Sequence, residues 1–160
     1  MTSKAETSTG HTETATTGGQ EEHAIRDLIA TREAAMRAGD AALLTSQYTA
    51  DLVQFSLAPP LQQAGPDENG LRNWFAGFGG TVDYEIRDLR VTIGGDVAFC
   101  TSLNRLSATP AAGGADRFTL WFRSTLGLRR IEGRWRITHE HQSTPFYMDG
   151  SFAAALDLTP

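Results

Sequence analysis

Two histidines one residue apart, His139 and His141, end a stretch in which apolar and polar residues alternate, and they are well suited to chemistry. Alternation with a period of two is typical of a β-strand, whose successive side chains point to opposite faces. Counted along this strand, Trp135 and Ile137 share a face with both histidines, whereas Glu140 falls on a polar face that meets water. An apolar wall ending in two imidazoles indicates a ligand pocket. The alternative is that both histidines are satisfied core or rim residues.

The preceding strand supplies further candidates, because Trp121 and Arg123 stand on alternate positions and share one face. If that face lines the same cavity as the histidines, the pocket has a stacking wall, a fixed cation and two proton carriers. Histidine titrates near neutral pH and suits general acid or base catalysis. A guanidinium suits a substrate carboxylate, enolate or phenolate, so Arg123 is a third candidate catalytic residue. Its alternative role is an ion pair with an acidic residue of a neighbouring strand: Asp83, Glu85 or Asp88.

The spacing of the two histidines also allows a metal ion to be considered. Their backbone positions lie about 6.5–7 Å apart in a strand, within reach of one ion. Zinc requires at least one more protein ligand, and the spacing supplies none. The single cysteine, Cys100, excludes an internal disulfide and a cysteine metal cluster. No glycine-rich phosphate loop is present, so the sequence predicts neither a metal nor a cofactor.

Length, composition and charge narrow the class of protein. The 160 residues fit one domain, and the net charge of −5 comes without the basic stripe typical of nucleic-acid binding. No segment is long and apolar enough to span a bilayer. Residues 1–20 are mostly small and polar, which predicts a disordered tail without the apolar run of a signal peptide. We therefore expect a cytoplasmic protein with one domain over residues 21–160, bound to neither nucleic acid nor membrane.

Helical patterns fill the first half of that domain. A helix is expected over residues 21–38, with Gly39 as its end. Arg32 stands on the apolar stripe of this helix, so it either extends to the edge or points into a polar cavity. Asp40 is the expected N-cap of a short second helix that holds Tyr48. A third helix follows residues 65–67 and buries Trp74 among other aromatic residues.

The second half of the domain is β-structure. Strands are expected over residues 51–56, 61–64, 82–93, 97–109 and 117–130, before the histidine strand. Long antiparallel strands after helices indicate an α+β domain, with helices on one face of a curved sheet. An apolar set on the fifth of these strands predicts a homodimer through the sheet face opposite the cavity. This set is Leu120, Phe122 and Leu126.

This order of elements resembles an NTF2-like, SnoaL-like domain. The likeness rests on Gly39-Asp40, Tyr48, Trp74 and the histidine strand, and it covers residues 21–160. The closing Ser143…Pro145-Phe146…Met148-Asp149 is most similar to the SgcJ/EcaC-type branch of bacterial secondary metabolism, which includes enediyne gene clusters. The resemblance implies a cone in which a curved antiparallel sheet packs against three N-terminal helices around an internal cavity.

The resemblance implies several functions, because this fold hosts isomerases, cyclases, hydrolases, dehydratases and non-enzymatic binders. Ketosteroid isomerases of the superfamily use a tyrosine on the first helix and an aspartate base in the first strand. Those positions correspond to Arg32 and Ser56, so steroid isomerisation by the known residues is not expected. Tyr48 and Trp74 are candidates for the cavity mouth, with plain core as the alternative.

The leading hypothesis is cofactor-independent acid–base catalysis of the isomerase, cyclase or hydratase type. Its substrate is an aromatic, polyketide or enediyne intermediate, and His139 or His141 transfers the proton. The rival hypothesis is a non-catalytic accessory protein that binds a metabolite or dimerises. The expected ligand contacts are the following five residues: Trp121, Tyr48, Trp74, Arg32 and Ser56.

Overall fold

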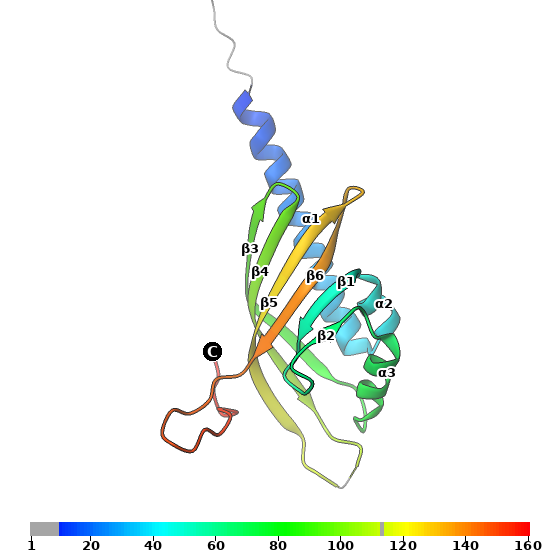
Figure 1. Ribbon diagram of the computed structural model, residues 1–160, viewed down its shortest axis with the longest axis vertical. Helices are drawn as coiled ribbons and strands as arrows, with labels where there is room; N and C mark the ends of the chain where they lie inside the picture. The colour runs from blue at the N-terminus through cyan, green and yellow to red at the C-terminus, as the bar shows by residue number, and fades with distance from the viewer. Residues whose placement is uncertain (1–9, 113) are drawn as a thin grey trace, which may run out of the picture.

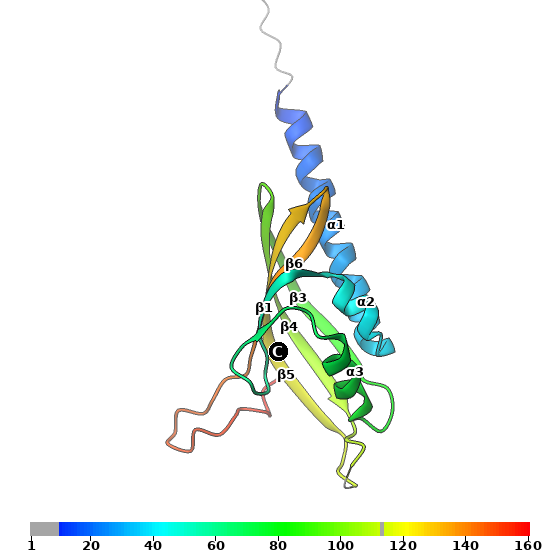
Figure 2. The same cartoon turned by 45° about the vertical axis from the view of Figure 1, so that its right-hand side comes forward.

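The computed structural model describes residues 10–112 and 114–160, and within them three helices lie against one six-stranded sheet (Figure 1). The helices are α1 (Gly10–Ala38), α2 (Ala41–Ser46) and α3 (Glu68–Ala76). The strands are β1 (Tyr48–Phe55), β2 (Gln63–Ala64), β3 (Asp83–Gly94), β4 (Val97–Ala108), β5 (Phe118–Ile131) and β6 (Arg134–Ser143). Figure 2 shows all three helices on one side of the sheet, which confirms the predicted α+β class.

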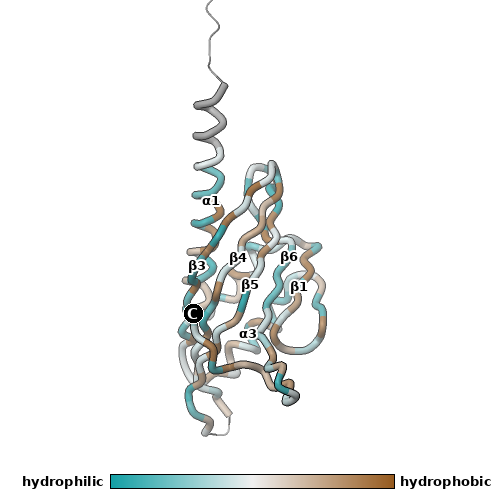
Figure 3. The backbone as a smooth tube through the Cα atoms, turned by 90° about the vertical axis from the view of Figure 1, so that its left-hand side faces the viewer, coloured by the Kyte–Doolittle hydropathy of each residue, from teal (hydrophilic) through white to brown (hydrophobic). Residues whose placement is uncertain are grey.

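The sheet has the order β2-β1-β6-β5-β4-β3. Every neighbouring pair is antiparallel except β1 and β6, which run parallel. The face toward α1 is called the inner face below, and the opposite face is called the outer face. Figure 3 shows hydrophobic and hydrophilic residues mixed along the strands, as two faces of different polarity require.

The helix boundaries follow the capping chemistry expected from the sequence. Gly39 ends α1 in the left-handed region with φ +66°. Asp40 then caps α2, because its carboxylate accepts the N–H of Leu43 at 2.9 Å. Asp67 caps α3 in the same way, with the N–H of Gly70 at 2.8 Å.

The start of α1 differs from the expectation. The helix begins at Gly10 rather than at residue 21, although its first turns have no apolar stripe. A helix that is nucleated by packed turns can extend into polar residues, because each added residue gains a backbone hydrogen bond. Of the predicted tail, residues 1–9 lie outside the described residues. No described helix is both long and apolar enough to cross a membrane.

Two apolar clusters form the core, and α1 contributes to both. Ile25 and Ile29 of α1 belong to the first, and Ala35 and Met36 belong to the second. The first cluster also contains Leu52, Ala98, Cys100, Leu126, Leu128, Trp135 and Ile137. The second also contains Leu44, Val82, Tyr84, Leu106, Ala108 and Phe122. Arg32 stands on α1 between the two pairs of apolar residues.

A β-bulge in β6 changes which side chains face the core. Leu128 of β5 pairs with Ile137, but the next residue of β5, Gly127, pairs with His139, so Thr138 is an extra residue. The alternation therefore reverses at this point. Ile137 faces the core, and beyond the bulge Glu140 does so, with only 1% of its surface exposed. The expectation that both histidines share a face with Ile137 is wrong, because strict alternation does not continue through a bulge.

The inner face of β5 corrects a second expectation. Phe122 and Leu126 are 4% and 6% exposed and belong to the two core clusters. The sequence analysis placed both residues on an exposed apolar face that would drive dimer formation. Because both are buried in the core, this argument for a homodimer is wrong. The side chains on the outer face of β5 are those of the alternate positions, Trp121 and Arg123 among them.

Candidate functional site

A group of polar side chains lies on the inner face, where α1, β1 and β6 meet. We call it the polar belt, and its members come from α1 (Arg32), β1 (Tyr48 and Gln54) and β6 (Glu140 and Gln142). On α1 the belt lies between the residues of the two apolar clusters. A charged group in such a place requires compensation by opposite charge and hydrogen bonds.

An ion pair forms the centre of the belt. Arg32 Nη2 lies 2.7 Å from Glu140 Oε2, and the two side chains are 7% and 1% exposed. The same nitrogen donates to the Tyr48 hydroxyl oxygen at 2.7 Å, and that hydroxyl donates to Glu140 Oε2 at 2.7 Å. The guanidinium also lies over the tyrosine ring, 5.1 Å from its centroid. Three residues from three elements therefore hold one another in a single arrangement.

Two amides complete the shell of the carboxylate. Gln54 Nε2 donates to Glu140 Oε2 at 3.2 Å, and Gln142 Nε2 donates to Oε1 at 2.8 Å. One carboxylate oxygen thus receives three donors and the other receives one. Since a carboxylate oxygen has two lone pairs, Oε1 has acceptor capacity beyond its bond to Gln142.

The belt holds its charges at neutral pH. Burial alone raises the pKa of Glu140, but the Arg32 charge and the hydrogen bonds from Tyr48 and Gln142 outweigh it, so the net pKa lies below its ordinary value. Burial raises the pKa of Tyr48 despite the nearby Arg32 charge. Burial lowers the pKa of Arg32, but Glu140 and Tyr48 raise it by more, so the net pKa lies above its ordinary value and the guanidinium stays charged. The belt is therefore a fixed array of charge and dipoles.

One nitrogen of Arg32 is different from the rest of the belt. Its Nη1 is fully buried and has no hydrogen-bond partner among the residues that the structure describes. A buried donor without a partner costs about 1–3 kcal/mol, more where the donor is charged. An acceptor oxygen placed against Nη1 would recover this energy, so the arrangement can anchor a carbonyl, carboxylate or phenolate.

Further polar side chains extend from the belt across the inner face. Ser124 of β5 pairs in register with Gln142 of β6 and with Ser102 of β4. Ser102 Oγ donates to Asn104 Oδ1 at 2.7 Å, and Asn104 Nδ2 donates to the Tyr84 hydroxyl at 2.8 Å. Burial raises the pKa of Tyr84, which keeps its hydroxyl protonated. Hydroxyl and amide groups therefore connect the belt to the second apolar cluster.

The two predicted catalytic histidines lie on the outer face. The ring of Phe55 meets both edge-on, with centroids 5.1 Å from His139 and 5.6 Å from His141. His139 Nδ1 lies 2.9 Å from the carbonyl oxygen of Val53. This bond and the aromatic contact hold the His139 ring against β1. Among the described hydrogen bonds, none joins the side chain of either histidine to a residue of the polar belt.

Arg123 and Trp121 share the outer face with the histidines, so all four of these candidates lie on the side of the sheet away from the polar belt. Arg123 pairs in register with Ser143, two residues beyond His141. The Arg87 guanidinium lies 5.0 Å from the Trp121 ring centroid. Arg123 takes part in none of the ion pairs found among the described residues. Two of the acids considered as its partners, Asp83 and Glu85, pair with Arg105 instead.

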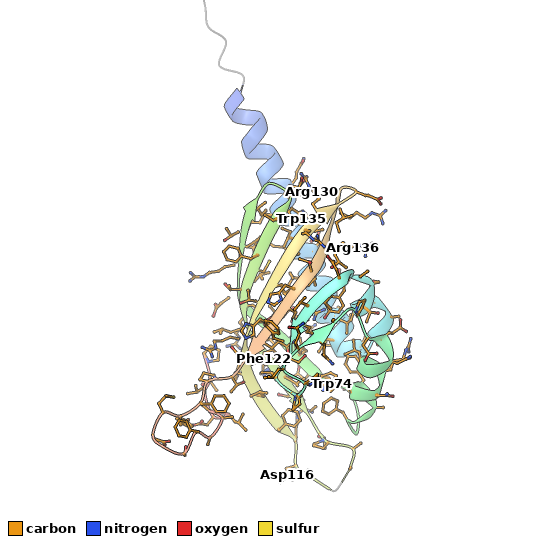
Figure 4. The ribbon with its side chains drawn as sticks, viewed as in Figure 1. Trp74, Asp116, Phe122, Arg130, Trp135 and Arg136 are labelled. Carbon is orange, nitrogen blue, oxygen red and sulfur yellow. The ribbon has the colours of Figure 1, made fainter. Side chains whose placement is uncertain are left out.

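The remaining predicted ligand contacts are separated. Arg32 and Tyr48 belong to the polar belt. Ser56 Oγ donates to Gln63 Oε1 at 3.3 Å, at the edge formed by β1 and β2. Trp74 lies on α3 (Figure 4) and packs edge-on against Phe75 of the same helix and Phe78 just beyond its end. Among the described side chains, no group of three or more His, Cys, Asp or Glu residues could hold a metal ion.

Glu140 is the functional candidate that the sequence analysis missed, and Arg32 carried the signal for it. An arginine on an apolar helix stripe that does not reach solvent requires a buried acid. Glu140 lies between the two histidines of the last predicted strand, so its neighbours in the sequence do not mark it as buried. The rule of strict alternation assigned it to solvent, because a one-residue bulge leaves no clear mark in the sequence.

Two grooves of about 310 and 350 Å³ lie between α1 and the start of β6. Both are lined by Leu28, Arg134 and Trp135, near the region where Figure 4 labels Trp135, Arg130 and Arg136. No belt residue lines either groove. Arg130 and Glu21 hold this end together, since Glu21 accepts from Arg130 at 2.5 Å and from Trp135 Nε1 at 2.6 Å.

Comparison with known proteins identifies the family. The model of the SnoaL-like domain matches residues 25–147. An NTF2-like protein of unknown function from Pseudomonas putida is 31% identical, with a TM-score of 0.76 over 90% of this chain and 98% of the other. The comparison with curated proteins finds no match.

Two more distant structures share the fold. An NTF2-like protein from Streptomyces avermitilis, provisionally named a dehydratase, is 18% identical, with a TM-score of 0.69 over 81% of this chain and 99% of the other. A ketosteroid isomerase-like protein from Erwinia carotovora is 24% identical, with a TM-score of 0.62 over 76% of this chain and 93% of the other. The family model and the similarity to the Pseudomonas protein show that the chain belongs to the SnoaL-like family of the NTF2-like superfamily.

Proposed function

We propose that this SnoaL-like protein binds a small organic molecule at the inner face of its sheet, through an acceptor oxygen held by Arg32 Nη1. The observation that carries the proposal is that this buried nitrogen makes no hydrogen bond within the described residues, although the other terminal nitrogen of Arg32 makes two. Glu140 stabilises the charge, and Nη1 is the nitrogen whose hydrogen-bonding capacity a ligand oxygen would use.

The surroundings of the belt define the chemistry of that ligand. A carbonyl, carboxylate or phenolate oxygen accepts from a guanidinium, and a charged donor strengthens the bond. The second apolar cluster, with the buried Phe122 and Tyr84, borders the belt, so a ligand body bound there would lie among apolar and aromatic side chains. These features suit a small aromatic or polycyclic molecule with one oxygen at its inner end.

Proton-transfer catalysis is a second candidate function, and the names of the dehydratase-like and isomerase-like structures favour it. A charged donor at a carbonyl oxygen stabilises the negative charge that develops as a neighbouring carbon loses a proton. Within the belt, Glu140 Oε1 is the oxygen with spare acceptor capacity. However, the lowered pKa of Glu140 makes it a weak base, so the belt itself favours binding.

The narrower predictions remain proposals. They are the likeness to the SgcJ/EcaC-type branch, an aromatic, polyketide or enediyne intermediate as ligand, and proton transfer by His139 or His141 with Arg123. The histidine proposal now requires a ligand on the outer face, which is a different site from the belt.

The two sites can be separated by one binding experiment. A panel of small phenols, aromatic ketones and aromatic carboxylates is titrated against the wild-type protein, and binding is followed by tryptophan fluorescence. Arg32→Lys keeps the charge but loses the planar fork, so we expect its affinity to fall at least ~10-fold. His141→Gln is the matched control and should bind as the wild type does. Unchanged binding by Arg32→Lys, or weakened binding by His141→Gln alone, would refute the inner-face proposal.

Turnover is tested on the same panel. Each compound that binds is incubated with the protein, and its proton NMR spectrum is followed for isomerisation, loss of water or exchange of a carbon-bound hydrogen. Loss of both binding and turnover in Arg32→Lys would support catalysis at the belt. Turnover that depends on His139 or His141 would assign catalysis to the outer face instead.

A further inference from the structure

The first three residues of β6, Arg134, Trp135 and Arg136, form a strand edge without a neighbour on one side. β1 pairs with β6 on this side, but its first pair joins Tyr48 to Ile137, so no described strand lies beside the three residues there (Figure 1). On the other side they pair with β5. We call this segment the open edge. Such an edge presents backbone N–H and C=O groups with which another extended chain can pair.

The backbone of Trp135 faces the open edge. Two residues further along β6, the N–H of Ile137 donates to the carbonyl of Gln47 at 2.9 Å, and Trp135 has the same orientation because a strand alternates. Arg130 is the β5 residue opposite Trp135, and its N–H donates to the carbonyl of Asp96 at 2.8 Å, away from β6. These two residues therefore exchange no backbone hydrogen bonds, and the N–H and C=O of Trp135 point to the open edge.

The two grooves beside Trp135 follow this edge. They are lined on α1 by residues from Gln20 to Thr31, and both include Leu28, Arg134 and Trp135. The helix rises about 16 Å between Gln20 and Thr31, which is the length of roughly five residues of extended chain. The space between α1 and the open edge therefore suits a short extended peptide.

One polar atom in the second groove has no partner. Gln47 lines this groove and is only 8% exposed. Its Nε2 donates to the carbonyl of Leu28 at 3.1 Å, whereas its Oε1 is buried and accepts no hydrogen bond within the described residues. A buried acceptor without a partner destabilises a fold, and an N–H group of a bound peptide would satisfy it.

Two arginines give the open edge its charge. Arg134 and Arg136 are two residues apart in β6 and therefore share a face, with the buried Trp135 between them on the other. The Arg136 side chain donates to the carbonyl of Ser46, and neither arginine forms an ion pair within the described residues. Opposite charges at facing positions of neighbouring strands stabilise their pairing. An acidic residue is therefore favoured opposite each arginine.

We propose that the open edge binds a short extended peptide of a partner protein, with the pattern acidic–apolar–acidic, as an added antiparallel strand. The central residue lies opposite Trp135 and exchanges both backbone hydrogen bonds with it. Its apolar side chain then points to the same face as Trp135, toward Leu28, and the acidic residues face Arg134 and Arg136. No residue of the polar belt lines either groove, so this site is separate from the proposed ligand site.

Synthetic peptides test the proposal on the wild-type protein. The probe is acetyl-Ala-Asp-Leu-Asp-Ala-amide, titrated into isotopically labelled protein and followed by NMR, and it should move the backbone amide signal of Trp135. A peptide with lysine in place of both aspartates should bind at least ~10-fold more weakly, because like charges then face each other. A methyl group on the leucine nitrogen removes the N–H that donates to the Trp135 carbonyl, and it should also cost at least ~10-fold in affinity.

A pair of variants tests the protein side of the contact. Arg134→Glu should weaken binding of the aspartate peptide at least ~10-fold. Arg90→Glu is the matched control, because Arg90 is an exposed arginine of β3, at the opposite edge of the sheet, and it undergoes the same reversal of charge. It should bind as the wild type does. Thermal unfolding shows whether both variants keep the fold, and the peptide comparison decides the question if Arg134→Glu does not.

Several results would overturn the proposal. They are equal affinities for the aspartate and lysine peptides, an unchanged affinity for the methylated peptide, or an unchanged affinity in a folded Arg134→Glu variant. Displacement of the peptide by the aromatic carboxylates of the panel at equal concentration would assign the groove to small anions instead. Dissociation of a protein oligomer on addition of the peptide would place a second copy of the chain at the open edge.

Discussion

Replacing Arg32 with methionine tests whether the polar belt is a true buried ion pair. The substitution would leave the Glu140 carboxylate, which is 1% exposed, with three neutral donors but no countercharge. Breaking a buried pair in this way costs about 3–5 kcal/mol. For a chain of 160 residues, a loss of 1 kcal/mol lowers Tm by roughly 2–4 °C, so Tm should fall by about 6–20 °C.

The assay is urea unfolding followed by circular dichroism, and the chain offers a matched control. Arg26 pairs with Glu22 at 2.7 Å, but both side chains are nearly half exposed. Arg26→Met should therefore cost less than about 0.5 kcal/mol. The double variant Arg32→Met/Glu140→Gln should lose less than the sum of its single variants, since each single change removes the same interaction. Equal stability losses for Arg32→Met and Arg26→Met would refute the buried ion pair.

Three further predictions concern pH, the thiol and the first residues. The pKa of Glu140 in the folded protein lies below its ordinary value of 4.5, so its ionised carboxylate stabilises the fold above pH 4.5, and this contribution is lost as the pH falls through the folded pKa. In Glu140→Gln the free energy of unfolding should therefore depend less steeply on pH in this range. An unchanged slope would contradict the buried ion pair. Burial raises the pKa of the Cys100 thiol to about 11, so a thiol reagent at neutral pH should label this residue only after the protein unfolds. Rapid labelling of the native protein would contradict this prediction. Deletion of residues 1–20 should leave Tm within about 2 °C of the wild-type value, because these small and polar residues can bury little apolar surface. A Tm lower by ~10 °C would mean that they pack on the domain.

Much of the fold could be predicted from the sequence, because local chemistry determines it. Gly39 and Asp40 set the break between α1 and α2, and Asp67 sets the start of α3. The long strands and their tight turns were also recognisable from alternation and glycine pairs. These features depend on residues close in sequence, which is why pattern reasoning is sufficient for them.

The candidate site could be predicted only in part. Arg32 and Tyr48 were identified as ligand-contact candidates, and both belong to the belt. Glu140 was missed because its side chain turns inward only after the bulge at Thr138. A bulge depends on pairing with β5, a neighbour that a strand pattern does not contain. The same reversal moved His139 to the outer face, which it shares with Trp121.

We propose Arg32 Nη1 as the anchor for an oxygen of a small molecule at the inner face. A crystal structure of the protein with the tightest-binding phenol, ketone or carboxylate of the panel would show where that oxygen lies. We expect a ligand oxygen within about 3.2 Å of Arg32 Nη1, with the Arg32–Glu140 pair unchanged. A ligand bound on the outer face beside His139 and His141, or in the grooves beside Trp135, with Arg32 Nη1 untouched, would contradict the proposal.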